Sequence, residues 1–131
     1  MDRIVIDTSA LMAVGLDEDR AEQCIAAMSD ADSLLIAAPT LTETLIVAMG
    51  RGISDAMRAT LDRLAPTVIE LTARRADDAA EAYRRYGKGW HAATLNFGDC
   101  FAYAAAKEHD CPLLYVGEDF AKTDIVAAIA P

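Results

Sequence analysis

The chain has 131 residues, and 53% of them are hydrophobic, which is enough for one packed domain over residues 1–131. Its formal net charge of -9 argues against nucleic-acid binding by broad electrostatic attraction, so a phosphate partner would need a local device such as a divalent cation. No apolar run approaches the ~20 residues that span a bilayer, and three cysteines without paired spacing predict neither a disulfide framework nor a zinc site. We therefore expect a cytoplasmic protein with no membrane partner.

The first predicted element is a short strand over residues 3–6 that delivers an acid at its end. Its β-branched residues without polar alternation are typical of a strand buried on both faces of a parallel sheet. Asp7 follows directly, and ligands in open α/β sheets bind outside the carboxyl ends of the strands. Asp7 or Ser9 could instead merely cap the helix that runs to about Gly15, and this segment alone leaves both interpretations open.

The next segments alternate between helices and strands and place a second acid early in a helix. We expect a helix over 17–30, a strand over 33–38, a helix from Pro39 to about Gly50, a helix from Ser54 to the residue before Pro66, and a strand over 67–71. Glu43 lies early in the third helix, where Thr40 and Glu43 have the spacing of a capping box. The box is the structural alternative to a site role for Glu43. The apolar hairpin of residues 39–64 is either core or a partner surface.

A basic and aromatic stretch follows a long helix predicted over residues 72–87. The chain has no acid from Ala82 to Gly98. Base stacking on aromatic rings with phosphate contacts is a common way to hold single-stranded RNA. The alternative is a basic helix end that complements the helix dipole, with its aromatics in the core. The RNA-binding candidates are Arg84, Arg85, Lys88, Trp90 and His91.

The stretch Leu95 to Ala106 carries the third acid, and the fourth comes soon after it. Alanines dominate this stretch after Asp99, which predicts a helix with Asp99 in its first turn and an end near His109. An apolar strand is predicted over residues 113–116, and Asp119 follows it as Asp7 follows the first strand. Ordinary surface-turn chemistry is the alternative for Asp119. A last strand or extended tail is expected over residues 125–129.

The order of these acids along the chain indicates one pocket. Each has a structural explanation, but strand ends and helix starts in an α/β protein meet at the same edge of a parallel sheet. Carboxylates held close together repel one another unless they are protonated or bind hard cations, and oxygen ligands suit Mg²⁺ or Mn²⁺. The chemistry that such a cation supports is hydrolysis of a phosphodiester. The four acids are Asp7, Glu43, Asp99 and Asp119.

Four segments together resemble PIN-domain ribonucleases, and within that group the VapC toxins of VapBC toxin–antitoxin pairs. They are residues 7–11 (DTSAL), Glu43 early in a helix, residues 95–104 (LNFGDCFAYA) and residues 117–124 (GEDFAKTD). The resemblance implies an α/β/α sandwich with a central, mainly parallel sheet and a metal-dependent endoribonuclease that cuts RNA, often tRNA or rRNA. It also implies a VapB antitoxin, a toxin homodimer and a higher-order complex with the antitoxin.

The resemblance also implies roles for individual residues. Asp7, Glu43, Asp99 and Asp119 match the acidic quartet, with Asp7, Asp99 and Asp119 as metal ligands. Ser9 matches the small polar neighbour of the first acid, and Thr123 the hydroxyl near the fourth. Glu118 stands where an aspartate is frequent, so whether Glu118 or Asp119 faces the metal stays open.

Two alternative functions need consideration. A catalytically silent PIN-like module that only binds protein is disfavoured by the intact quartet. A phosphoacceptor signalling domain also places acids at strand ends around Mg²⁺. That class needs a paired acid early in the chain, a mid-chain aspartate at a strand end and a late lysine, whereas Asp99 lies at a helix start.

Overall fold

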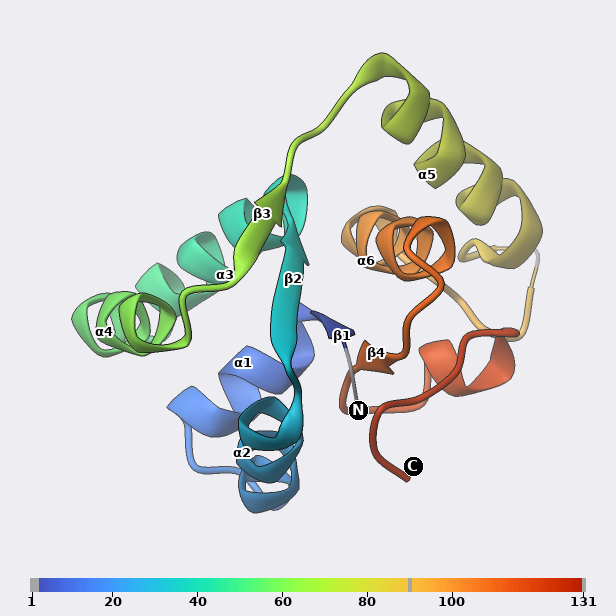
Figure 1. The fold of residues 1–131 in the computed structure, drawn as a ribbon. Coiled ribbons are helices and arrows are strands. Elements are labelled where there is room, and N and C mark those ends of the chain that lie inside the picture. Colours follow the sequence, from blue (N-terminus) through green and yellow to red (C-terminus); the bar gives the residue numbers. More distant parts are fainter. Residues whose placement is uncertain (1–2, 90, 131) are drawn as a thin grey trace.

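Four parallel strands form the centre of the computed structural model, which describes residues 3–89 and 91–130 (Figure 1). The strands are β1 (Arg3–Ile6), β2 (Ser33–Ala37), β3 (Thr67–Ile69) and β4 (Leu113–Leu114). Their order is β3-β2-β1-β4, and every pairing is parallel. The chain thus proceeds outward from β1 to β3 and then returns to the other side of β1. The point where strand order reverses, between β1 and β4, is where α/β folds open a ligand crevice.

Helices cover both faces of this sheet, which confirms the predicted three-layer α/β/α sandwich with a parallel sheet. One layer contains α1 (Thr8–Gly15), α2 (Ala21–Asp30), α3 (Ala38–Gly50) and α4 (Ser54–Leu64). The other contains α5 (Ala73–Tyr86) and α6 (Phe97–Glu108), and a short 3-10 turn, η1 (Phe120–Lys122), lies in the C-terminal segment (Figure 1). Among the described residues, no helix combines the length and the apolar character that crossing a bilayer requires.

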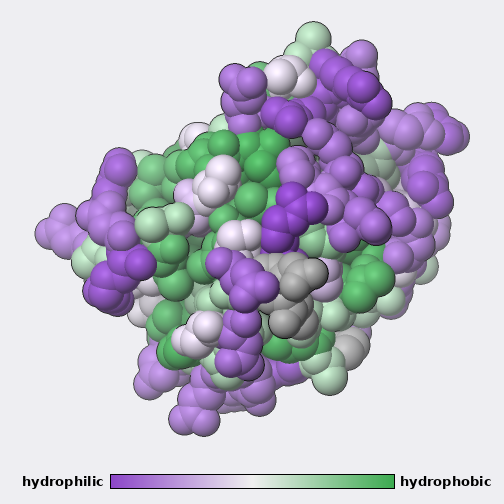
Figure 2. Space-filling view, viewed as in Figure 1, coloured by the Kyte–Doolittle hydropathy of each residue, from purple (hydrophilic) through white to green (hydrophobic). Residues whose placement is uncertain are grey.

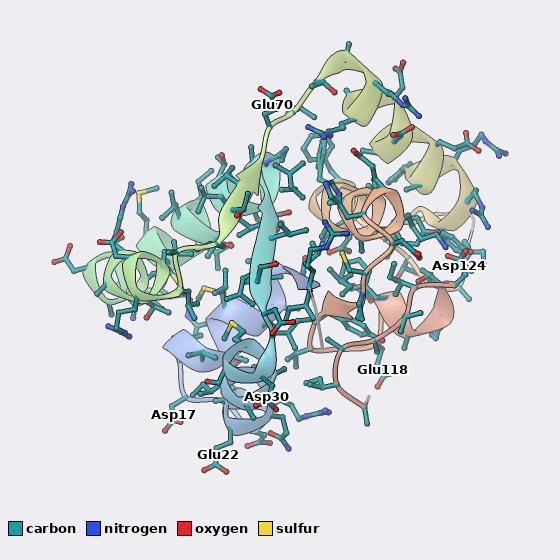
Figure 3. All side chains as sticks on the ribbon, in the orientation of Figure 1. Asp17, Glu22, Asp30, Glu70, Glu118 and Asp124 are labelled. Atoms are coloured by element: carbon teal, nitrogen blue, oxygen red, sulfur yellow. The ribbon has the colours of Figure 1, made fainter. Side chains whose placement is uncertain are left out.

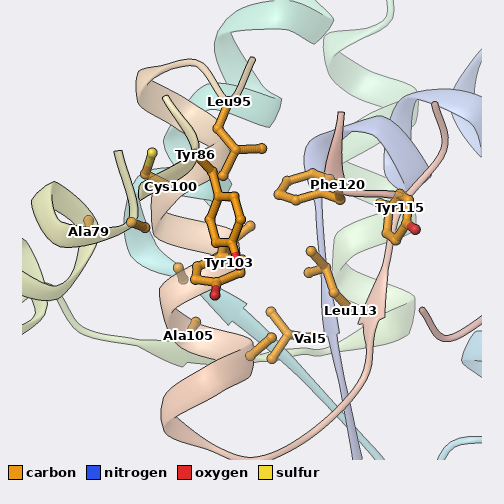
Figure 4. Close-up of a cluster of buried hydrophobic side chains, with 14 of the residues drawn as sticks. Val5, Ala79, Tyr86, Leu95, Cys100, Tyr103, Ala105, Leu113, Tyr115 and Phe120 are labelled. Atoms are coloured by element: carbon orange, nitrogen blue, oxygen red, sulfur yellow. The ribbon is translucent and has the colours of Figure 1, made fainter. Parts of the chain in front are cut away.

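The apolar strands form two separate cores because successive side chains point to opposite faces. Ile4, Ile6 and Ile36 pack with α1 to α4, whereas Val5 and Leu35 pack with α5 and α6. The second core extends to the segments on either side of the candidate site, since Leu95 and Phe120 both belong to it (Figure 4). Burial of these two side chains therefore anchors the chain just before Asp99 and just after Asp119. All three cysteines are free and buried.

Several elements are shorter than predicted, and the sheet explains most of the differences. The strand predicted over 67–71 ends at Ile69, because its partner strand ends at Ala37, where α3 begins. The strand predicted over 113–116 ends at Leu114, because β1 ends at Ile6. The tail over 125–129 forms only an isolated bridge from Ala127 to Leu113. The helix predicted from residue 17 begins at Ala21, after a turn in which Asp17 has a φ of 52°.

The molecular surface is mostly polar, with an apolar patch on one side. Figure 2 shows hydrophobic side chains gathered around α3 and β3 within a largely hydrophilic surface. Exposed large apolar residues there include Ile46, Met49 and Val68. The most exposed is Phe97, at 78%, which is the first residue of α6.

Candidate active site

Asp7 lies at the carboxyl end of β1 and has both of the roles that the sequence left open. It caps α1, since its Oδ2 accepts hydrogen bonds from the Ser9 amide at 3.0 Å and from the Ser9 hydroxyl at 2.7 Å. Its Oδ1 is buried and has no hydrogen-bond partner among the described residues. Burial, with Asp7 only 3% exposed, raises the pKa of this carboxyl to about 6. Capping uses one oxygen and leaves the other for a ligand.

Ser9 connects two strand ends at this pocket. Its hydroxyl donates to Asp7 Oδ2 and accepts a hydrogen bond from the Val116 amide at 2.9 Å. Val116 follows β4, so the side chain that holds Asp7 also fixes the start of the segment that leads to Asp119. The structure thus places Ser9 beside the first acid, where the resemblance put it.

Glu43 does not form the predicted capping box, and that interpretation is wrong. Helix α3 begins at Ala38 directly after β2, with the extended residue Ala37 at the N-cap and Pro39 in the first turn, so Thr40 is already helical. A capping threonine must have extended backbone, which Thr40 lacks. Glu43 instead reaches α1, where the Thr8 hydroxyl donates to its Oε1 at 2.6 Å.

Gly98 allows α6 to approach Glu43. A Cβ on Gly98 would lie 2.8 Å from the Glu43 carboxyl carbon, closer than real Cβ contacts. A Cβ here would therefore force the Glu43 carboxylate to shift, although Gly98 does not have a positive φ. This contact places the Glu43 carboxylate against the residue that precedes Asp99.

Asp99 occupies the first turn of α6, as predicted, and it forms the capping box that the sequence had suggested elsewhere. The Asn96 side chain accepts from the Asp99 amide at 2.9 Å, and Asp99 Oδ2 accepts from the Asn96 amide at 3.0 Å. Burial raises the pKa of Asp99 to about 7, and the charges of Asp7, Asp119 and Glu43 act in the same direction. The four predicted acids are thus close enough to repel one another.

Asp119 and Glu118 are neighbours in the segment after β4, but they differ in their relation to the pocket. Asp119 is exposed, and the Thr94 hydroxyl lies 3.4 Å from its Oδ1. Glu118 is exposed too. Burial raises the pKa of Tyr115 and the Glu118 charge acts in the same direction, whereas the charge that acts on Asp99 is that of Asp119. Of the two neighbouring acids, Asp119 is therefore the one coupled to the pocket.

Thr123 and Asp124 make contacts within the C-terminal segment. The Thr123 hydroxyl donates to the Phe120 carbonyl at 2.7 Å and accepts from the Ile125 amide, which closes the turn after η1. Asp124 accepts from the Tyr103 hydroxyl and from Lys107 at 3.1 Å, which fastens this segment to α6 (Figure 3). The structure shows no hydrogen bond between Thr123 and any of the four acids.

Most other acids lie away from the pocket. Asp17, Glu22 and Asp30 are exposed around α2, at the opposite side of the molecule from Asp124 in Figure 3. These charges contribute to the net charge of -9 without affecting Asp99. Asp7 and Asp99 differ from these acids in being buried.

The donor set of the pocket fits a hard divalent cation held by few direct ligands. In residues 3–89 and 91–130, no three histidine, cysteine, aspartate or glutamate side chains converge as a complete metal cage. Mg²⁺ does not need one, since it is commonly bound by one or two carboxylates and completes its shell with water and substrate phosphate. The unpartnered Asp7 Oδ1 and the raised pKa of both Asp7 and Asp99 are the features that a bound cation would relieve.

The basic residues of the stretch 84–91 are close in sequence but have different contacts in the structure. Arg84 pairs with Glu81, with Nε 2.9 Å from Oε2, and Arg85 lies over the Tyr86 ring at 4.9 Å. The pKa of Asp124 is lowered mainly by the hydrogen bond from Tyr103, and the Arg85 charge adds a smaller contribution in the same direction. Lys88 is exposed, whereas His91 packs edge-on against the buried Tyr86. Trp90 lies outside the described residues. The stretch is acid-free only along the chain, because Glu81 pairs with Arg84 from one turn earlier in α5, and Asp124 in the C-terminal segment lies within electrostatic range of Arg85.

Sequence reasoning missed four residues that shape the pocket. Thr8 and Thr44 contact one another and lie beside Glu43, Thr94 approaches Asp119, and Asn96 caps the helix of Asp99. The Asn96 spacing to Asp99 was a detectable signal, since a short polar residue three positions before an acid is typical of a helix start. The threonine contacts had no such signal, because Thr8 lies 36 residues from Thr44.

Comparisons with known proteins agree with this geometry. The family model for the PIN domain matches residues 4–126. A protein named ribonuclease VapC from Mycolicibacterium smegmatis is 43% identical over 127 residues, which cover 95% of this chain and 98% of that protein.

Solved structures support the fold. The crystal structure of VapC20 from Mycobacterium tuberculosis, described as a sarcin-ricin loop cleaving toxin, superimposes with a TM-score of 0.78 at 21% identity, covering 98% of this chain and 99% of that one. A toxin–antitoxin complex from Klebsiella pneumoniae gives a TM-score of 0.72 at 19% identity, covering 96% and 98% of the two chains. The family match over residues 4–126 and the 43% identical relative show that the chain belongs to the PIN-domain family and, within it, to the VapC ribonucleases.

Proposed function

We propose that this chain is the toxin of a type II toxin–antitoxin pair and hydrolyses RNA phosphodiester bonds at the pocket of Asp7, Glu43, Asp99 and Asp119. We treat residues 1–131 as one PIN domain that acts in the cytoplasm, where its RNA substrate is found. The observation that carries the proposal is the buried, unpartnered Oδ1 of Asp7 beside a second buried acid, Asp99, whose pKa is raised. Two such groups are costly in an inert protein-binding module and useful in a metal-dependent nuclease.

Asp7 and Asp99 would hold a divalent cation, Mg²⁺ or alternatively Mn²⁺, with Asp119 as the third and more exposed ligand. When bound, the cation would neutralise phosphate charge and activate water. Ser9 keeps Asp7 Oδ2 occupied, so that Oδ1 faces the cation. Glu43 accepts the proton of the attacking water through the carboxylate oxygen that Thr8 does not hold.

The substrate that we propose is a tRNA or an rRNA. Lys88 and Arg85 would contact phosphates, whereas Arg84 contributes less because Glu81 already pairs with it. His91 and Trp90 stay candidates for RNA binding on the sequence alone. Thr123 and Glu118 would support the turn that carries Asp119 rather than the metal itself.

The proposed protein partner is a VapB antitoxin. An apolar groove of about 540 Å³ lies directly beside Glu43 and suits the apolar side chains of a docking tail. A basic residue of that tail would enter the acidic pocket and pair with its carboxylates. We also propose a toxin homodimer and a larger complex with the antitoxin. The groove is lined by Pro39, Ile46, Val47, Leu71, Phe97 and Phe101.

The test is cleavage of an end-labelled RNA pool by the purified chain with Mg²⁺, and again with excess EDTA. We expect discrete cleavage products with Mg²⁺ and none with EDTA. Absence of cleavage under both conditions by folded protein that still binds antitoxin would instead support a silent protein-binding module. Incorporation of phosphate from a small phosphodonor would support the phosphoacceptor alternative.

A further inference from the structure

We propose that Thr8 and Thr44 are positioning residues that orient the Glu43 carboxylate toward the proposed catalytic pocket. This inference rests on the proposed function, since it assumes that Glu43 takes part in cleavage. It gives a role to Thr8, which lies within the segment 7–11 but had none assigned, and to Thr44, and the contact between them crosses from α1 to α3.

Thr8 is the direct contact. Its buried hydroxyl lies 2.6 Å from Glu43 Oε1, a distance typical of a charge-assisted hydrogen bond. An ionised carboxylate only accepts hydrogen bonds, so Thr8 must donate its single hydroxyl proton to Glu43. Thr8 then needs a different donor for its contact with Thr44.

Thr44 completes the arrangement from the next position along α3. Its hydroxyl is fully buried and lies 3.0 Å from the Thr8 hydroxyl and 2.9 Å from the Thr40 carbonyl oxygen. Because the Thr8 proton is used by Glu43, the single Thr44 proton is shared between the Thr8 hydroxyl and the Thr40 carbonyl oxygen, which itself lies 3.3 Å from the Thr8 hydroxyl. Thr44 thereby restrains the rotation of the Thr8 hydroxyl that holds Glu43.

The two carboxylate oxygens of Glu43 therefore have different neighbours. Oε1 is tied to α1 through Thr8, whereas Oε2 is the atom nearest to where a Cβ of Gly98 would lie. Gly98 precedes Asp99, so Oε2 faces the α6 side of the pocket. A free glutamate side chain would sample several rotamers, and the hydroxyl pair removes that freedom before substrate binds.

Other helical threonines of the chain show what a purely local role looks like. Thr42 and Thr60 each donate to the carbonyl four residues earlier, at 3.2 and 3.0 Å, without contacting an acid. Thr44 could satisfy its hydroxyl in the same way through Thr40. Unlike Thr42 and Thr60, it also contacts a hydroxyl from another helix, Thr8, and that hydroxyl makes its shortest contact with Glu43.

The experiment compares steady-state and single-turnover cleavage by the full chain for Thr8→Val, Thr8→Ser, Thr44→Val and the control Thr60→Val. Valine keeps the shape of threonine and removes its hydroxyl, whereas serine keeps the hydroxyl. We expect Thr8→Val to lower kcat about 10- to 100-fold with little change in KM, as for residues that orient a functional ligand. Thr8→Ser should restore most of the loss, Thr44→Val should lose less than Thr8→Val, and Thr60→Val should match the wild type.

A double-mutant cycle with Glu43→Ala shows whether the threonines act through Glu43. Thr8→Val should have no further effect on kcat in the Glu43→Ala background, and unfolding in EDTA should show the same coupling between the two positions. Melting temperature, recorded for every variant, separates loss of fold from loss of orientation. If Thr8→Val does not fold, Thr44→Val and Thr8→Ser carry the comparison.

Two results would overturn the inference while leaving the proposed function in place. One is an inactive Glu43→Ala with folded Thr8→Val and Thr44→Val variants that turn over like the wild type. The other is a Thr8→Val effect of equal size with and without Glu43. Full turnover by Glu43→Ala itself would instead refute the role of Glu43 in the proposed function, and the inference with it.

Discussion

The acidic pocket and the basic stretch of residues 84–91 differ in how the fold treats neighbouring charges. The acids are far apart in sequence, yet β1, α3, α6 and the segment after β4 bring them together around Asp99, whose pKa is raised by burial and further by the charges of the other three acids. The basic residues are adjacent in sequence, yet Glu81 and Asp124 lie beside Arg84 and Arg85. Unrelieved repulsion at buried acids is costly, so it indicates a function better than a run of like charges on a helix end.

The largest expected effect comes from neutralising one member of the pocket. Asp7→Asn or Asp99→Asn should each lower RNA cleavage at saturating Mg²⁺ by about 1,000-fold or more, since each removes a charged metal ligand. The fold should remain intact, because asparagine can still accept hydrogen bonds at both helix starts. Cleavage kinetics and circular dichroism check both statements. Near-wild-type turnover by either variant, free of contaminating nuclease, would remove that residue from the mechanism.

A smaller loss should follow from crowding Glu43. Gly98→Ala adds a Cβ where the Glu43 carboxylate lies, so the carboxylate must move from the pocket. We expect kcat to fall about 10- to 100-fold with a modest drop in melting temperature. Gly50→Ala is the matched control, because a Cβ at Gly50 meets nothing within 4 Å. Equal activity of the two variants would show that the position of Glu43 does not matter.

The pH dependence of the free energy of unfolding tests whether the pKa of Asp99 is raised. Burial raises the pKa of Asp99 to about 7, above its unfolded value, so its stabilising contribution is full below about pH 4 and is lost as pH rises through 7. In EDTA, Asp99→Asn should therefore unfold like the wild type near pH 4 and be more stable by a few kcal/mol at pH 8. Chemical denaturation at several pH values measures this difference. A constant difference across that range would contradict the raised pKa.

The smallest effect is expected in the basic stretch. Lys88→Ala should weaken binding of a non-cleavable RNA several-fold and reduce the salt dependence by about 0.7 in slope, as expected for one phosphate contact with a single strand. Arg84→Ala should do less, because Glu81 already offsets its charge. Fluorescence anisotropy across a salt series distinguishes the two variants. Identical slopes for both variants and the wild type would assign the stretch to structure alone.

The sequence allowed prediction of those parts of the fold that depend on local pattern. The apolar run before Asp7 and the alanine-rich helix of Asp99 both formed as predicted, because burial and helix propensity act over neighbouring residues. Strand lengths were overestimated, because the end of β3 is decided by where β2 becomes α3. The end of the partner strand β2 limits the length of β3, and the sequence pattern of residues 67–71 carries no information about it.

The candidate site was predictable in its acids but not in what surrounds them. Strand ends and helix starts located Asp7 and Asp99, whereas Thr40 with Glu43 had capping-box spacing in a place where the backbone is already helical. Spacing alone does not report the extended backbone that a cap requires. The contact of Thr8 with Glu43 joins two helices across 35 residues, and only the packing of α1 on α3 produces it.

The most direct test of the account is calorimetric titration of metal-free protein with Mg²⁺ in buffers of different ionisation enthalpy. At pH 6.5 part of the Asp7 and Asp99 carboxyl groups is protonated. These groups must therefore release protons if they bind the cation. We expect proton release at pH 6.5, little at pH 8.5, and loss of Mg²⁺ binding in the Asp7→Asn, Asp99→Asn double variant. Mg²⁺ binding of equal affinity by the double variant, or binding without proton release at pH 6.5, would contradict it.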